Sequence, residues 1–368
     1  MQINDAYDYL VHLIACAIRK ETPKPIPEGI SYEQVLDCAI DHEVAGFAYL
    51  GLKRLEILPD EEIMKCWKAR YMLGVQRNAL QEAAGKILLE RLHEKGITTL
   101  ELQGTRVKKY YPSPELRMMG DIDLIVEKAQ LSAAEETLKE LGYKTVRQND
   151  FEVDGKKDKI NVEIHTEFFA EYDDFARILT NPYANVTVRD NYEADAGDKI
   201  FLMYHLAHCL KHFLCYGVGI RRILDLYILD TAYTDEALKE EIFGEMAKAG
   251  HEAQARALVM LAGYWFGGRE PQEELTEVIR TVKISGSHGV FENNLQNQVN
   301  SRKAKGKHFV KLRYFLSLIF LPKEVMYHLY PFCKKHSYPL VLCWIYRVPR
   351  LLFKKGKWKR LKYYINNI

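Results

Sequence analysis

The sequence predicts an α+β protein in which a small mixed sheet with its own helices lies between two helical regions. Residues 61–94 and the chain from about 195 onward carry apolar side chains at helical spacing. The intervening stretch holds short runs of β-branched and apolar residues bounded by glycine and proline, as in 97–102 and 120–126. At 368 residues the chain is also too long for one small core. We therefore expect a N-terminal helical region at 1–92, a core at 93–192 and a C-terminal helical region with a basic tail at 193–368.

The N-terminal region is expected to begin with an amphipathic helix. Leu10, Leu13 and Ile14 lie at helical spacing within residues 1–20. Acidic residues precede this apolar stretch and basic residues follow it, which is the reverse of the order in a signal peptide. No run reaches the roughly 18 apolar residues that a membrane span needs. The seven cysteines are scattered, without a CxxC pair or zinc-finger spacing. We therefore expect reduced thiols and a cytoplasmic protein without a transmembrane segment.

The middle unit reads in order as β-α-β-α-β-β. Gly96 and Gly104 bound the first strand, prolines close the loop after the first short helix, and Gly142 stops the second helix. The polar stretch 152–159 is expected to be the turn that joins the last two strands, and a Gly-rich break is expected at 216–219. The expected elements are strand 97–102, helix 105–111, strand 121–126, helix 129–141, strand 143–148 and strand 159–165.

The strand at 121–126 carries two aspartates, Asp121 and Asp123, among isoleucine, leucine and valine. Because strand side chains alternate, both aspartates share one face while the apolar residues share the other. Adjacent carboxylates repel and raise each other's pKa unless a cation lies between them. An exposed strand edge or a turn with solvated acids would also explain a bare DxD pattern. The later strand favours a cation, because Glu163 and His165 there also share one face, opposite two apolar residues.

Three converging carboxylates, Asp121, Asp123 and Glu163, predict a site for Mg²⁺, with Mn²⁺ as an alternative. Hard oxygen ligands suit Mg²⁺, which completes its shell with phosphate and water. Two such ions about 4 Å apart clamp the attacking and leaving oxygens in phosphoryl or nucleotidyl transfer. The third carboxylate holds the second metal or accepts the proton of the attacking hydroxyl. Beside them, the turn at 103–105 ends a strand and opens a helix, where backbone N–H groups favour an anion.

The run QGTRVKKYYPSPELRMMGDIDLIV at 103–126, followed by VEIH at 162–165, resembles the polymerase-beta-like nucleotidyltransferase superfamily. More closely, it resembles a family whose members are described only as nucleotidyltransferases. The resemblance extends to HLAHCLKHFLCYGVGIRRILDLYIL and covers about residues 95–330. Two positions depart from that family's pattern: Gln103 replaces the usual lysine before the glycine, and Glu163 stands where an aspartate is more usual.

The resemblance implies Mg²⁺-dependent transfer of a nucleoside monophosphate from an NTP, by default ATP, to an acceptor hydroxyl with release of pyrophosphate. Asp121 and Asp123 would bind both metals. Glu163 would bind the catalytic metal and could act as the base. The acceptor stays open among a small molecule, a protein side chain and an RNA end.

The resemblance also implies a set of nucleotide-binding residues. Gly104 and Thr105 would cradle the β- and γ-phosphates. Arg117 would either reach the triphosphate or anchor its loop through a carboxylate. The remaining candidates are Lys211, His212 and Arg221, which would line the nucleotide or acceptor pocket or brace it, Arg221 doing so through a pair with Asp225.

Three histidines, His205, His208 and His212, recur at i, i+3 and i+7 on one face of a helix. This spacing allows a structural zinc site, a helix that faces the active-site cleft, or a helix packed with hydrogen-bonded histidines. The sequence offers no evident fourth zinc ligand, which disfavours zinc.

The charge of the chain is uneven. Residues 301–368 hold 17 Lys+Arg and a single acid, Glu324, for a net charge of +16, which leaves −14 on the rest. This tail could meet an anionic surface such as RNA or a membrane, or dock on the acidic body. A non-catalytic nucleotide-sensing or RNA- or membrane-binding module is therefore the alternative to a transferase. Another metal-dependent phosphotransferase or hydrolase is a third option, whereas the motifs of P-loop enzymes and kinases are absent.

Overall fold

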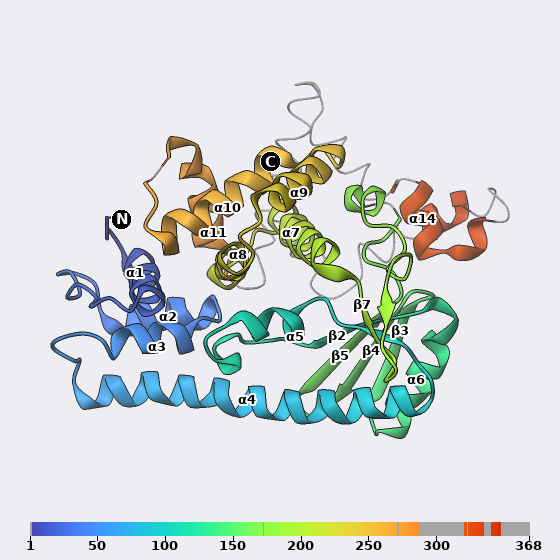
Figure 1. Cartoon of the computed structure of the whole chain (residues 1–368), viewed down its shortest axis with the longest axis horizontal. Helices are drawn as coiled ribbons and strands as arrows, with labels where there is room; N and C mark the ends of the chain where they lie inside the picture. Colours follow the sequence, from blue (N-terminus) through green and yellow to red (C-terminus); the bar gives the residue numbers. More distant parts are fainter. Residues whose placement is uncertain are drawn as a thin grey trace.

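The structure is a computed structural model that describes residues 2–171, 173–270, 272–286, 320–321, 323–334 and 340–346. Within these ranges, a seven-stranded mixed sheet lies at one end of the molecule, with helices before and after it in the chain (Figure 1). The long helix α4 (Glu61–Glu94) runs along one side of the molecule and reaches beneath the sheet. The predicted α+β class, a mixed sheet flanked by helical regions, is confirmed.

The strand order is β3-β4-β5-β2-β1-β7-β6. The central strand β2 (Ile122–Val126) pairs in parallel with β5 (Ile160–His165) and antiparallel with β1 (Thr99–Leu100). In the β2–β5 register, Asp123 lies directly opposite Glu163. The other strands are β3 (Lys144–Asn149), β4 (Glu152–Lys157), β6 (Thr187–Val188) and β7 (Glu193–Asp195).

Strand β4 corrects the turn expected at 152–159, because most of that stretch pairs with β3 and β5. Gly155 lies against helix α6 (Leu131–Glu140), so closely that an added Cβ would lie 3.1 Å from Leu138. Val153, two residues earlier, is fully buried. The inward-facing positions of β4 are thus a valine and a glycine, and the glycine is there because α6 leaves no room for a side chain. Because glycine has no apolar side chain, the alternation expected of a strand is not visible in the sequence.

Other elements of the sheet also differ from expectation. The strand at 97–102 is confined to β1, and the helix at 105–111 divides into α5 (Gly104–Val107) and a 3₁₀ turn. No sequence pattern predicts the short, polar hairpin β6–β7. Strand β7 pairs in parallel with β1, although it lies after residue 192, where the core unit is expected to end. The division into units at 92/93 and 192/193 stays a prediction.

Capping side chains begin three N-terminal helices, α1 (Ala6–Arg19), α2 (Tyr32–Asp41) and α4. Asp5 and Asp60 each accept a hydrogen bond from the backbone N–H three residues on, and Ser31 forms a capping box with Gln34. Helix α3 (Ala45–Leu52) packs against α1 and α4. Gly74 of α4 allows close approach, since a Cβ there would lie 3.2 Å from the sulfur of Met118.

The predicted Gly-rich break at 216–219 is confirmed, because it separates helix α7 (Gly197–Cys215) from helix α8 (Ile220–Ala232). Gly217 has a φ of 82°. Gly219 packs so closely that a Cβ would lie 2.7 Å from the carbonyl oxygen of Gly286. The C-terminal helices are α7 (Gly197–Cys215), α8 (Ile220–Ala232), α9 (Glu236–Lys248), α10 (Glu252–Gly267), α11 (Thr276–Ser285) and α14 (Lys323–Leu329).

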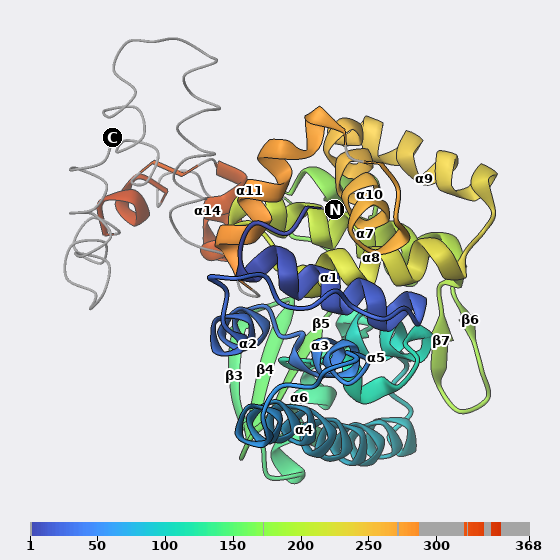
Figure 2. The same cartoon turned by 90° about the vertical axis from the view of Figure 1, so that its left-hand side faces the viewer.

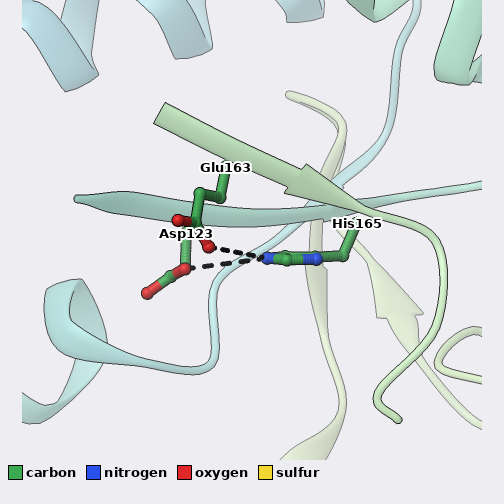
Figure 3. A group of neighbouring side chains, drawn as sticks. All are labelled: Asp123, Glu163 and His165. Carbon is green, nitrogen blue, oxygen red and sulfur yellow. Dashed lines mark ion pairs between the residues drawn. The ribbon is translucent and has the colours of Figure 1, made fainter. Parts of the chain in front are cut away.

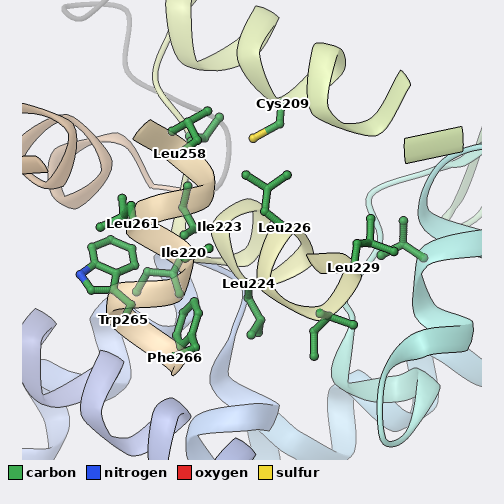
Figure 4. Close-up of a cluster of buried hydrophobic side chains, with 14 of the residues drawn as sticks. Cys209, Ile220, Ile223, Leu224, Leu226, Leu229, Leu258, Leu261, Trp265 and Phe266 are labelled. Atoms are coloured by element: carbon green, nitrogen blue, oxygen red, sulfur yellow. The ribbon is translucent and has the colours of Figure 1, made fainter. Parts of the chain in front are cut away.

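Two hydrophobic cores hold these layers together. In the larger core, helix α1 packs between α3 and α10, so that N-terminal and C-terminal helices share one interior (Figure 2). Figure 4 shows the part built by α8 and α10, with Ile223 and Leu224 near Trp265 and Phe266. The smaller core lies between α4, α6 and the sheet, and the apolar residues of β2 and β5 point into it. The alternate residues of these strands, including the acids, therefore face the other side of the sheet.

The basic tail at 301–368 lies largely outside the described residues, and so do the predictions that it docks or binds an anionic surface. In the ranges that are described, no helix has both the length and the apolar character needed to cross a membrane. All seven cysteines are described and carry free thiols, as their spacing predicts.

Candidate active site

The polar face of the parallel β2–β5 pair carries three side chains that point toward one another, Asp123, Glu163 and His165 (Figure 3). Nε2 of His165 lies 3.7 Å from Oδ1 of Asp123 and 3.6 Å from Oε2 of Glu163. One ligand atom from each of the three lies within 4.8 Å of the others, a spacing that one metal ion could bridge. Two carboxylates and an imidazole suit a divalent cation.

Asp121, in the turn before β2, belongs to the same electrostatic cluster. Burial, followed by repulsion from Asp123 and Glu163, raises the pKa of Asp121 to about 7. The neighbouring His165 first, and then Asp121, lower the pKa of Glu163 against the opposing effect of burial. Asp121 therefore influences the charge of Glu163, although the group close enough to hold one metal ion contains His165 in place of Asp121.

His165 compensates the negative charge of this cluster. Burial favours its neutral form, but the ion pairs with Asp123 and Glu163 outweigh burial and raise its pKa to about 10. Protons on His165 and Asp121 thus do what a metal cation would otherwise do, which is to neutralise crowded acids. Strand alternation predicts that His165 lies on the acidic face, but no role for this histidine was predicted from the sequence.

The acids form one wall of a cavity of about 440 Å³. Gln103 and Gly104 lie beside them, and basic residues of α7 and α8 form the wall across from them. Of the predicted site residues, those that line this cavity are Gly104, Arg117, Asp121, Asp123, Glu163, Lys211, His212 and Arg221. The volume lies within the range of small-molecule sites, roughly 300–1,000 Å³.

A family model described as uncharacterised nucleotidyltransferase matches residues 28–267 of this chain. The chain belongs to this family. The matched region runs from before α2 to the end of α10, and so includes the acids of β2 and β5 and the basic wall of α7 and α8. No curated protein and no solved structure matches the chain significantly. The predicted resemblance to a nucleotidyltransferase family is confirmed.

In this member of the family, Arg117 anchors its loop through a carboxylate. Its Nε and Nη2 each lie 2.8 Å from an oxygen of Asp225, and the hydroxyl of Tyr111 donates to the same carboxylate at 2.6 Å. Burial opposes the charge on Asp225, but Arg117 outweighs it and lowers the pKa of that carboxyl. Arg117 also borders the cavity, so its binding of a nucleotide stays a prediction.

The predicted phosphate cradle of Gly104 and Thr105 is divided between two places. A Cβ on Gly104 would lie 2.7 Å from Nη1 of Arg117 and 3.0 Å from Met119, so glycine is required there by packing. Thr105 lines a separate cavity on the α4 side, with Lys108 and Ile122. The Gly104 backbone therefore lies in the acidic cavity without the neighbouring hydroxyl.

Two other predicted pocket residues have acidic partners. Arg221 lies 2.8 Å from Glu43 and donates to the backbone carbonyl of Met118. The expected Arg221–Asp225 pair is therefore not formed, because the buried Asp225 faces the Arg117 loop. Lys211 lies 3.4 Å from Asp173 and above the ring of Phe169.

The three histidines of α7 do not converge on one ion. His208 and His212 approach each other, with their Nε2 atoms 3.2 Å apart, at the edge of the cavity. His205 is buried away from them, and neither of its ring nitrogens has a hydrogen-bond partner among the described residues. Among the residues that the structure describes, the one group of three or more potential ligands close enough for a metal is Asp123, Glu163 and His165. The cleft-facing reading therefore holds for His208 and His212.

Arg222 is a cavity residue that the sequence analysis missed. The available signal was its place beside Arg221 at the start of α8, on a helix whose positions 220, 221, 223, 224 and 225 are buried. In the structure, Arg222 lines the cavity together with Lys211 and His212 of α7.

Proposed function

We propose that the protein is a divalent-metal-dependent nucleotidyltransferase that moves a nucleoside monophosphate from an NTP to an acceptor hydroxyl. The observation that carries this proposal is the pairing of Asp123 with Glu163 across adjacent parallel strands, with Asp121 and His165 beside them. Family membership supports the reaction class, and the cavity bordered by acids on one side and cations on the other suits a metal-bound polyphosphate.

The donor set fits Mg²⁺ or Mn²⁺ held by Asp123 and Glu163, with Asp121 or His165 completing the protein ligands. Such an ion, or a pair of them, supplies charge stabilisation at the phosphoryl oxygens. The acceptor oxygen would form a bond to the α-phosphorus while the bond from that phosphorus to the β-phosphate oxygen breaks and pyrophosphate leaves. Glu163 would receive the hydroxyl proton.

The nucleotide would lie along the cavity with its phosphates toward the acids. The backbone of Gly104 and the side chains of Lys211, His212 and Arg221 border that path. Thr105 and Arg117 are less direct candidates, since Thr105 lines the other cavity and Arg117 is held by Asp225. ATP is the default NTP, and the acceptor is open.

A non-catalytic sensing module would have no need for three mutually repelling acids. The basic tail on which that alternative rests lies mainly outside the described residues.

Turnover of α-labelled NTPs with Mg²⁺ or Mn²⁺ tests the proposal. Asp123→Asn should abolish label transfer and pyrophosphate release while leaving circular dichroism unchanged. Asp158→Asn, in the exposed turn before β5, is the matched control and should keep full turnover. Wild-type protein that releases no pyrophosphate with any of the four NTPs, across a panel of sugars, peptides and RNA ends, would contradict the proposal.

A further inference from the structure

Arg222 is a cation in the acidic cavity that has no carboxylate within ion-pair distance among the described residues. Its neighbours differ in this respect, since Arg221 pairs with Glu43 and Lys211 pairs with Asp173. The one side-chain hydrogen bond that the described structure gives Arg222 joins its Nη1 to Nδ1 of His208 at 3.1 Å. A charge held in a cavity without a counter-ion is costly unless an anion arrives to pair with it.

The histidine that holds Arg222 is neutral. Arginine only donates, so Nδ1 of His208 must accept, and the ring proton must be on Nε2. That N–H lies 3.2 Å from Nε2 of His212, which can accept its proton. Burial, and then the charge of Arg222, lowers the pKa of His208 well below its ordinary value. The positive charge of Arg222 is therefore left uncompensated by its own partner.

Gln103 connects this arrangement to the turn at Gly104. Its amide contacts both His208 and the hydroxyl of Tyr204, at 3.1 and 3.2 Å. Gln103 directly precedes Gly104, whose backbone borders the same cavity. The chain of contacts Gln103–His208–Arg222 thus holds a guanidinium fork at a fixed place beside the turn.

We propose that Arg222, held by His208, binds the β- and γ-phosphates of the incoming NTP and then the pyrophosphate that it becomes. The identity of the ligand as an NTP rests on the proposed function, whereas the binding of a polyphosphate anion by Arg222 does not. A planar guanidinium matches two phosphate oxygens at once. It also lies near enough to the acids to favour the charged form of Asp121, so it acts on the same site. The ligand class is a polyphosphate.

Binding of inorganic tripolyphosphate in saturating Mg²⁺, followed by calorimetry, tests this role without any turnover. Arg222→Gln should weaken binding by about tenfold to a hundredfold, as expected for loss of charge-assisted hydrogen bonds. Arg222→Lys, which keeps the charge but not the fork, should recover part of the loss. Arg280→Gln removes one charge from an exposed pair with Glu277 and should leave the affinity unchanged.

The outcomes separate the two proposals. If Arg222→Gln weakens tripolyphosphate binding but the wild-type protein turns over no NTP, the anion site is supported and the proposed reaction is contradicted. If Arg222→Gln changes neither NTP turnover nor tripolyphosphate affinity, the proposed reaction is supported and the role of Arg222 is contradicted. Should Arg222→Gln fail to fold, Arg222→Lys decides, because wild-type affinity and pyrophosphate inhibition in that variant would contradict a guanidinium fork. Binding of Mn²⁺ alone should change less than threefold in either variant.

Discussion

Arg117 and Asp225 form a buried, two-bonded ion pair that ties the loop before β2 to helix α8. Both contacts measure 2.8 Å, and the side chains are 6% and 0% exposed. The loop that follows carries Asp121, and the helix carries Arg222. The pair therefore sets the distance between the acidic and the basic wall of the cavity.

Removing one partner of this pair should strongly destabilise the fold. Asp225→Asn or Arg117→Gln leaves the other charge buried and unpaired, for an expected loss of about 3–5 kcal/mol in the free energy of unfolding. Urea unfolding measures this loss. Arg280→Gln, in the exposed pair with Glu277, is the control and should have no measurable effect. A loss below about 1 kcal/mol for both buried variants would contradict the bracing role.

Gly104→Ala should damage the site through packing. The added methyl would lie 2.7 Å from Nη1 of Arg117, so the ion pair or the turn must shift. We expect a loss of about 1–3 kcal/mol in unfolding free energy, together with lower affinity for NTP. Gly244→Ala is a matched control, because Gly244 is an exposed position of α9 with no atom within 4 Å of its added Cβ. This control should stabilise by roughly 0.5–1 kcal/mol, and equal effects of the two changes would contradict the packing argument.

The acidic part of the site could be predicted because strand alternation is a local rule. Asp121 and Asp123 alternate with core residues, and so does Glu163, hence their faces follow from the sequence. The pairing of the two strands adds the register that places Asp123 opposite Glu163. Family resemblance supplied the remaining step, since spacing alone does not say that these strands are neighbours.

The basic wall could not be predicted residue by residue. Which arginine pairs with which acid depends on the packing of α8 against a distant loop, and the sequence offered Arg221 for Asp225 where the fold uses Arg117. Strand β4 escaped notice for a similar reason. Its inner face is filled by Gly155, whose small size makes sense only beside Leu138.

His165 should shift the metal preference toward Mn²⁺. An imidazole nitrogen 3.6 Å and 3.7 Å from the two carboxylates adds a softer ligand to an oxygen site. His165→Gln should lower the affinity for Mn²⁺ by about tenfold, near 1.4 kcal/mol, and that for Mg²⁺ by less. Titration calorimetry with each metal measures both. His251→Gln, outside the cavity lining, is the control. An equal loss for both metals in His165→Gln would contradict the preference for Mn²⁺, and no loss for either metal would contradict the ligand role.

His42 should make the fold less stable in mild acid. It is 3% exposed, and its Nδ1 accepts a hydrogen bond from the backbone N–H of Ile220 at 3.2 Å, which joins α2 to α8. Burial lowers its pKa to about 4, against smaller opposing effects of Asp41 and the backbone of Lys283. The unfolded chain, with an ordinary value near 6.5, therefore takes up the proton first. This contribution is complete above pH 6.5 and is lost as the pH falls toward 4, by about 3 kcal/mol at most. Urea unfolding at pH 7.5 and pH 5 should show a smaller difference for His42→Gln, which keeps an acceptor but does not titrate, than for the wild type. The same difference in both proteins would show that other buried histidines, such as His205, account for the acid sensitivity.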